Sequence, residues 1–173
     1  MPHPGPVAPD RFTIARHERA SPARVHLPAG VTLLDALRDT ASALGGGQEE
    51  QAVVFTLIHG GFAPCVHCLA TADPTGHTLA TYTPWQTRRA VEVLGGSATF
   101  GISVDGAPMV HCHAWFSDPD AGTLAGGHLD SAATVLGPRG LVVLAWGLGA
   151  ISVRQTSDAE TNHAVFMPRE CRA

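Results

Sequence analysis

The chain has 173 residues, of which 45% are hydrophobic and 15% are charged. These proportions exclude the collagen-like, coiled-coil and disordered classes, and a single domain of this length builds a sizeable core without disulfide bonds. All 11 basic residues are arginine, and 15 acidic residues bring the net charge to −4. The charge balance therefore argues against nucleic-acid binding by neutralisation of phosphates.

The ends of the chain differ in character from the middle. Residues 1–10 are rich in Pro and Gly, which predicts a flexible tail, followed by a single domain over 11–168 and a short C-terminal tail over 169–173. The start lacks the apolar stretch of a secretory signal. The longest apolar run, Leu141–Ile151, is shorter than the roughly 18 residues of a membrane helix, so we expect a cytoplasmic protein with no membrane partner.

One helix is expected, and strands follow it. Between Val31 and Leu44 apolar residues recur close to every 3.6 positions, and a run of three glycines ends the pattern. Short apolar or alternating runs then predict strands at Ala52–Ile58, Cys65–Thr71, Thr78–Tyr82, Ala90–Leu94, Ala98–Val104, Met109–Phe116, Leu141–Trp146 and Ala164–Met167. The pair Asp105-Gly106 is typical of a hairpin turn. These patterns predict an α+β fold, a mostly antiparallel sheet with one main helix packed across it.

The strongest chemical signal is a set of three histidines. His111 and His113 lie two positions apart in a predicted strand, so they share a face and stand about 6.6 Å apart. A turn at 118–122 leads to a second strand, and a hairpin centred between Pro119 and Asp120 would place His128 directly opposite His111. Three imidazoles on one face can converge on one ion.

This set predicts a divalent metal site with an open coordination position, because a closed structural site would need a fourth protein ligand. Zinc is the first choice, and nickel, iron and manganese are alternatives that also accept imidazole. The competing interpretation is three strand histidines that only form hydrogen bonds, since the chain contains ten histidines.

Other candidates are weaker. Cys65 and Cys68 lack the second pair of a zinc ribbon and are expected to be buried strand residues rather than a redox pair. His59, Asp130 and Glu160 are candidates for a pocket and for general acid or base chemistry, if the sheet brings them to the histidines. Four arginines near the start form a candidate contact with an anion such as DNA, or else a solvated surface: Arg11, Arg16, Arg19 and Arg24.

The chain resembles the PPC (plants and prokaryotes conserved) domain over residues 11–168. The resemblance is carried by the segments 30–37 and 91–100 and, above all, by His111-Cys112-His113 followed after a turn by Gly126-Gly127-His128-Leu129. It implies an antiparallel sheet with a flanking helix, assembled as a homotrimer. Low surface charge and the apolar segments around Trp85, Trp115 and Phe116 also favour such an assembly.

The resemblance also bears on function. Plant members carry AT-hooks and associate with DNA, and bacterial members inherit a DNA-binding label, but this chain has no Arg-Gly-Arg-Pro hook. The family is distantly similar to acetolactate decarboxylase, a zinc enzyme whose two histidines and a third beyond a turn match His111, His113 and His128. Three hypotheses follow: metal binding, a metal-dependent lyase or hydrolase acting on a small keto or hydroxy acid, and DNA binding. A small anionic ligand is a further candidate partner.

Overall fold

A computed structural model describes residues 3–9, 14–16, 20–44 and 52–171. The helix is α1 (Leu33–Leu44). The strands are β1 (Ser21–Leu27), β2 (Val53–Phe62), β3 (Cys65–Cys68), β4 (Ala70–Ala72), β5 (Ala80–Tyr82), β6 (Gln86–Arg88), β7 (Val91–Ile102), β8 (Pro108–Asp118), β9 (Thr123–Leu129), β10 (Leu136–Gly147), β11 (Ile151–Asp158) and β12 (His163–Glu170). The predicted fold class, α+β with a largely antiparallel sheet, is confirmed.

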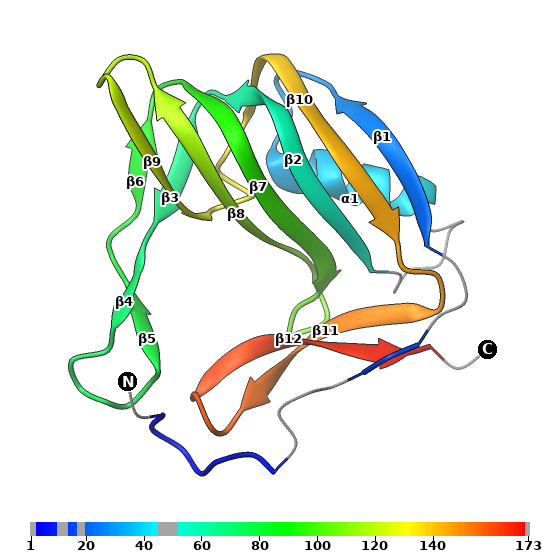
Figure 1. Cartoon of the computed structure of the whole chain (residues 1–173), viewed down its shortest axis with the longest axis vertical. Coiled ribbons are helices and arrows are strands. Elements are labelled where there is room, and N and C mark those ends of the chain that lie inside the picture. Colours follow the sequence, from blue (N-terminus) through cyan, green and yellow to red (C-terminus); the bar gives the residue numbers. More distant parts are fainter. Residues whose placement is uncertain (1–2, 10–13, 17–19, 45–51, 172–173) are drawn as a thin grey trace.

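The main sheet runs in the order β1-β10-β2-β7-β8-β9-β3-β6, and every neighbouring pair in it is antiparallel. Within the described residues, the hairpin of β11 and β12 pairs with this sheet through one parallel bridge, between Arg154 and Ile102 of β7. In Figure 1 this hairpin lies below the curved main sheet, on the same side of the molecule as the small β4–β5 ribbon. The hairpin and the ribbon thus frame one face of the sheet.

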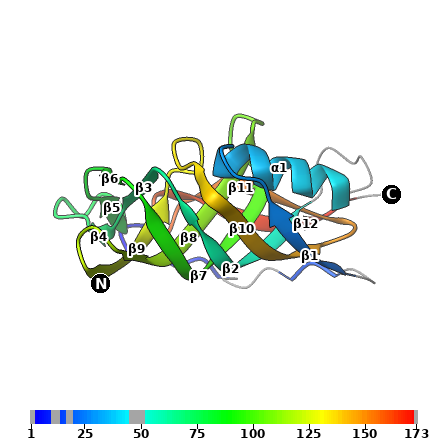
Figure 2. The same cartoon turned by 90° about the horizontal axis from the view of Figure 1, so that it is seen from above.

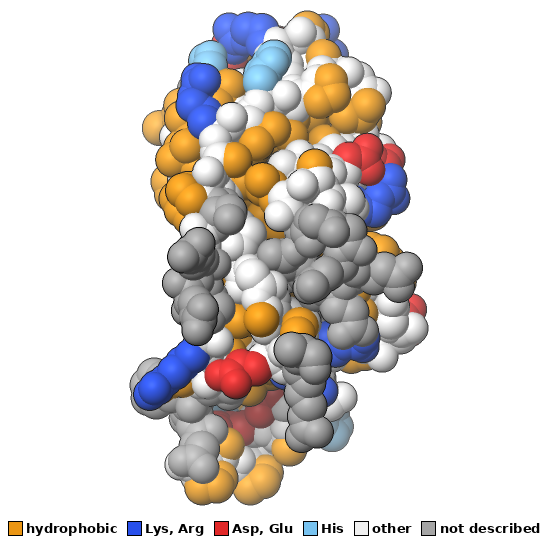
Figure 3. Space-filling view, turned by 90° about the vertical axis from the view of Figure 1, so that its right-hand side faces the viewer, with side chains coloured by type: hydrophobic (Ala, Val, Ile, Leu, Met, Phe, Trp, Pro, Cys, Tyr) orange, Lys and Arg blue, Asp and Glu red, His pale blue; other side chains and the backbone are white. Residues whose placement is uncertain are grey.

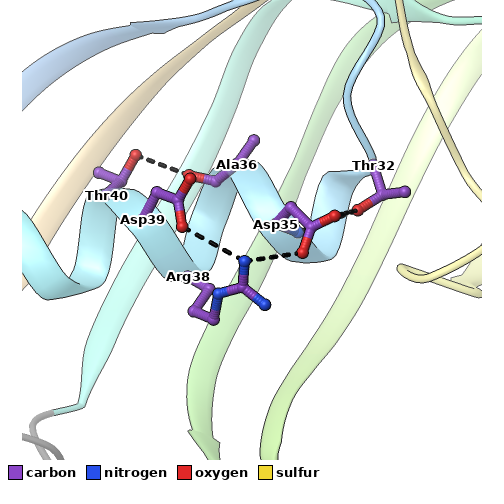
Figure 4. Close-up of polar contacts among 6 residues, drawn as sticks. All are labelled: Thr32, Asp35, Ala36, Arg38, Asp39 and Thr40. Carbon is purple, nitrogen blue, oxygen red and sulfur yellow. Dashed lines mark hydrogen bonds and ion pairs between the residues drawn. The ribbon is translucent and has the colours of Figure 1, made fainter.

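Helix α1 begins at a capping contact and covers the opposite face of the sheet (Figure 2). The hydroxyl of Thr32 accepts the backbone N–H of Asp35 at 3.0 Å and donates to the Asp35 carboxylate at 2.7 Å. Figure 4 shows this cap together with the ion pair between Arg38 and Asp35 on the outer side of the helix. Leu33 and Leu37 point the other way and are fully buried, which fixes the helix on the sheet.

Strand β8 shows how the two faces of the sheet differ. Its even-numbered residues from Val110 to Phe116 are buried in the core beneath α1. The residues between them, His111, His113 and Trp115, lie on the other face, which α1 leaves open. Trp115 lies over Gly95 of β7, where any larger side chain would collide with the indole at less than 3 Å. The alternation therefore assigns the histidines to the open face.

Several boundaries differ from the sequence-based expectations. Strands β1 and β11 were not predicted, and the two strands expected at Ala90–Leu94 and Ala98–Val104 are one continuous strand, β7. Strand β12 runs to Glu170, so residues 169 and 170 pair with β11 rather than forming a tail. Residues 3–9 of the expected N-terminal tail contact Glu160: the Gly5 N–H donates to its carbonyl at 2.9 Å.

The surface carries few charges for its size. Seen from the side on which β1 lies, charged side chains are scattered among hydrophobic ones (Figure 3). Trp85 and Trp115 are 52% and 59% exposed, whereas Phe116, also expected at the surface, is fully buried, with its ring 5.1 Å from the His67 ring. Among the described residues, no helix has the length and apolar character needed to cross a membrane.

Candidate metal centre

Three histidines lie together on the open face of the sheet. His111 and His113 project from β8 and His128 from β9, with ring centroids 4.9 to 5.1 Å apart in all three pairs. Each ring offers a nitrogen that lies within 4.8 Å of the other two. We call this set the histidine triad.

The pairing that builds the triad differs from the expected one. His128 lies opposite His113, not opposite His111. The centre of the turn lies one residue later in the chain than predicted. The Asp118 carboxylate accepts the N–H groups of Asp120 and Ala121, both at 3.1 Å, and Gly122 takes a positive φ of 64°. The hairpin register is thus shifted by two residues. A two-residue shift leaves every side chain on its original face, so the histidines still meet.

The spacing of the triad nitrogens fits a tetrahedral metal ion. His128 Nδ1 and His113 Nε2 are 3.3 Å apart. In a tetrahedral site with zinc–nitrogen bonds of 2.0–2.1 Å, two ligand nitrogens lie about 3.3–3.4 Å from each other. Without an ion, one of these nitrogens donates a hydrogen bond to the other. The residues present therefore fit a divalent metal held by three imidazoles.

Two rings of the triad, those of His111 and His128, favour the neutral form. Burial lowers the pKa of His111 to about 4, and the neighbouring His128 and His113 rings add to the effect. Burial also lowers the pKa of His128, helped by His113 and opposed by the carboxylate of Asp130. A neutral imidazole has a lone pair available for a metal, whereas a protonated one does not.

Aromatic side chains surround the triad on two sides. Tyr82 and Trp85 lie next to His128, with ring centroids 5.9 and 6.0 Å away. On the other side, the Phe166 ring of β12 lies 6.1 Å from His111. The triad is therefore flanked by rings from segments far away in the sequence.

A cavity of about 350 Å³ adjoins the triad at His111. It is bounded by β8, by the segment 79–82 that includes β5, and by the β11–β12 hairpin. Its lining side chains are Leu79, Ala80, Tyr82, Met109, His111, Gln155, Thr161, His163, Ala164, Val165 and Phe166. None of these residues is a carboxylate or an arginine. The site is thus a concave, mainly apolar pocket with imidazoles in its wall.

His163 is the pocket residue that the sequence did not reveal. It follows the β11–β12 turn, and its Nε2 lies 2.7 Å from the carbonyl oxygen of Ala80. The Ala80 N–H also lies 3.3 Å from this nitrogen, so Nε2 donates to the carbonyl in one tautomer and accepts from the N–H in the other. Asn162 at positive φ (52°) precedes it at the end of the turn. An Asn-His pair beside a turn was the only signal in the sequence.

The three expected pocket residues do not line this cavity. His59 is exposed on β2, two strands away from β8. The Asp130 carboxylate accepts the N–H groups of Ala132 and Ala133 at 3.0 Å and so shapes the turn after β9, although it is close enough to act on His128.

Glu160 has a structural environment. It is 3% exposed, and its carboxylate contacts the His3 ring and accepts the Ala8 N–H at 3.0 Å. Among the described residues, Glu160 therefore anchors the segment 3–9 to the β11–β12 turn rather than facing the triad.

Cys65 and Cys68 are buried, as expected, and so is Cys112, whereas Cys171 is partly exposed. Burial raises the pKa of both Cys65 and Cys112 to about 12, which keeps these thiols protonated and unreactive. Cys68 lies directly across from His128 in the β3–β9 pair, and burial raises its pKa as well.

The N-terminal arginines do not form a described patch. Arg11 and Arg19 lie outside the described residues, and Arg16 and Arg24 are exposed. Elsewhere, Arg38, Arg88, Arg89 and Arg139 each pair with a carboxylate within 2.7 to 3.4 Å. These pairs reduce the positive charge available for phosphates.

Comparison with known proteins identifies the family. The family model of the Plants and Prokaryotes Conserved domain matches residues 18–147, a range that contains α1, the main sheet and the triad. The chain belongs to this family. The cavity depends in part on β11 and β12, which follow the matched range. No curated protein matches the chain.

Solved structures share the fold. A metal-containing protein from Archaeoglobus fulgidus is 16% identical, with a TM-score of 0.66 over 90% of this chain and 99% of that one. A PPC protein from Pyrococcus horikoshii is 17% identical, with a TM-score of 0.57 over 87% and 92%. A protein from Ralstonia eutropha JMP134, named as a candidate DNA-binding protein, is 18% identical, with a TM-score of 0.59 over 83% and 89%.

Proposed function

We propose that this PPC-domain protein binds a divalent transition metal, with zinc as the first choice, through His111, His113 and His128. The observation that carries the proposal is the 3.3 Å separation of His128 Nδ1 and His113 Nε2, with all three ligand nitrogens within 4.8 Å of one another. The fold neighbour from Archaeoglobus fulgidus, named as metal-containing, supports it.

The donor set favours zinc over harder cations. Imidazole nitrogen suits zinc, copper, iron and nickel, whereas magnesium and calcium prefer oxygen ligands. The three rings supply three of the four ligands of a tetrahedral ion, and no carboxylate belongs to the cluster among the described residues. An ion held in this way keeps a position for an exchangeable ligand.

Metal analysis of protein purified without a histidine tag tests the proposal. We expect close to one equivalent of a transition metal per chain and its loss in the double variant His113→Ala/His128→Ala. His59→Ala is the matched control, because His59 is exposed on the same sheet but outside the triad. Less than about 0.3 equivalents of any transition metal after loading, with no difference between the variants, would contradict metal binding.

The second candidate function is catalysis by a metal-dependent lyase or hydrolase acting on a small keto or hydroxy acid. The cavity next to His111 is the observation that favours it, since an enzyme needs a concave site beside its metal. A bound divalent ion supplies Lewis acidity to a chelated oxygen or a bound water. His163 lies in the cavity wall, whereas His59, Asp130 and Glu160 do not, so His163 is the candidate for proton transfer. Turnover of such acids by metal-loaded protein, absent in His163→Phe with metal retained, tests this function.

We also propose the homotrimer that the family resemblance implies. Trp115, Leu94 and Ile58 are 59%, 50% and 44% exposed, which is unusual for such large apolar side chains on a solitary domain. Light scattering at low micromolar concentration should give about 54 kDa, three times the 18.0 kDa of one chain. A stable 18 kDa species with full metal content would contradict this assembly.

A further inference from the structure

We propose that the cavity adjoining the triad binds a small monoanionic chelating ligand, of the carboxylate or hydroxamate class, with an uncharged apolar body. The inference rests on the proposed metal centre and adds to it the class of ligand and the direction in which the ligand lies. It also assigns a binding role to side chains of β12, which follows the part of the chain matched by the family model.

The charge of the site requires an anion at the metal. Three neutral imidazoles carry no negative charge to offset the two positive charges of a divalent ion, and the nearby Asp130 carboxylate, which acts on His128, supplies only one. No Asp or Glu belongs to the triad cluster or lines the cavity, as far as the described residues extend. An anionic ligand offsets this charge, whereas a neutral ligand does not. The fourth ligand is therefore expected to carry a negative charge.

The cavity itself offers no second site for a charge. It contains no arginine, and lysine is absent from the whole chain. Three of its polar side chains already have partners within the protein: the Gln155 amide donates to the Ala164 carbonyl at 3.4 Å, the Thr161 hydroxyl donates to the Asp158 carboxylate, and His163 Nε2 contacts the Ala80 backbone. A second carboxylate on the ligand would lose its hydration without gaining a cationic partner, so dianionic ligands are disfavoured.

The shape of the cavity sets the direction of the ligand. His111 belongs both to the triad and to the cavity wall, so the two spaces are continuous. Beyond it, Met109 lies two positions earlier on the same face of β8, and Phe166 faces His111 from β12. The volume of about 350 Å³ is at the lower end of the range of small-molecule sites, about 300–1,000 Å³. A short alkyl or aryl body bound at the metal would pack between these two side chains.

Three hydroxamates test the inference, measured by titration calorimetry against the full-length protein loaded with Co(II), whose absorption reports the metal's ligands. Acetohydroxamate is the base probe, butanohydroxamate adds two methylenes, and the monohydroxamate of succinic acid adds a carboxylate at a similar length. Full burial of a methylene contributes up to about fourfold in affinity, and partial burial contributes less. We expect butanohydroxamate to bind about tenfold more tightly than acetohydroxamate, and the succinic compound to bind no more tightly than acetohydroxamate.

The variant Ala164→Phe narrows the cavity without touching the triad, and Ala121→Phe is the matched control in the exposed β8–β9 turn. We expect the butano-to-aceto ratio to fall below about threefold in Ala164→Phe and to stay near tenfold in the control, with full metal content in both.

Equal affinities for the two alkyl probes in metal-loaded wild-type protein would overturn the ligand class, as would tighter binding of the succinic compound. An unchanged ratio in Ala164→Phe would overturn the location. Protein that takes up no metal would overturn the metal centre, and the ligand proposal with it, so the two failures are distinguished by the metal content of the same samples.

Discussion

Replacing two triad histidines should abolish stabilisation by zinc while leaving the metal-free fold nearly intact. His113 and His128 lie on the open face, outside the hydrophobic core, and their replacement removes the hydrogen bond of 3.3 Å between the two rings. Such a bond contributes about 0.5–1.5 kcal/mol. The double variant His113→Ala/His128→Ala should therefore unfold, without metal, within about 1 kcal/mol of the wild-type protein.

Zinc should separate the two proteins clearly. A ligand present at 100 times its Kd stabilises the folded state by about 2.7 kcal/mol. For a chain of this length, 1 kcal/mol moves the Tm by about 2–4 °C, so wild-type protein should gain about 5–11 °C. The double variant should gain less than about 1 °C, and His59→Ala should behave like the wild type. Thermal unfolding followed by circular dichroism, with chelator-treated protein as the zero point, measures all three.

The test lies in which variants zinc stabilises, not in how far it raises the Tm. An equal zinc-induced rise of the Tm in the wild type and the double variant would show that zinc binds elsewhere. A large loss of stability in the metal-free double variant would show that the rings support the fold itself.

Three further predictions concern pH, the N-terminal segment and DNA. The pKa of His111 falls from 6.5 to about 4 on folding, so the unfolded chain binds more protons than the folded one between these pH values. The stability of the metal-free protein should therefore decline as the pH drops from 6.5 to 4, and less steeply in His111→Gln. An identical pH profile in the two proteins would contradict this cause. Glu160→Gln removes the carboxylate charge next to His3. Residues 3–9 should then be cleaved sooner by a nonspecific protease, and the free energy of unfolding should fall by about 1–3 kcal/mol. Unchanged cleavage would contradict the role of Glu160 in holding this segment. A fluorescence titration with duplex DNA at about 50 mM salt should show no binding at micromolar protein, as the negative net charge indicates, and binding that survives deletion of residues 1–24 would reveal a contact surface elsewhere.

The sequence determined which side chains share a face. Alternation in a strand has a period of two, so His111 and His113 had to project together, and the apolar residues between them had to enter the core. His128 joined them although the predicted register was wrong, because the error was two residues and not one. Periodicity also sufficed for α1, whose buried side, including Leu33 and Leu37, follows the helical repeat.

Elements without a clear pattern were missed. Strand β1 contains Pro22 and lies at the edge of the sheet, where the missing N–H donor is tolerated but the usual strand signature is weak. Strand β11 carries polar residues from Arg154 onward, because beyond its bridge to β7 it pairs only with β12. Neither strand owes its formation to local sequence alone.

The cavity was decided by tertiary structure. His163 and Phe166 are more than 50 residues from His111 in the chain, and a hairpin joined to the main sheet by a single bridge brings them to it. Likewise, the sequence made Glu160 a candidate acid, whereas in the folded chain its carboxylate binds the N-terminal segment. Local periodicity assigns a side chain to a face of its own strand, but which distant element packs over that face depends on contacts that no short stretch of sequence contains.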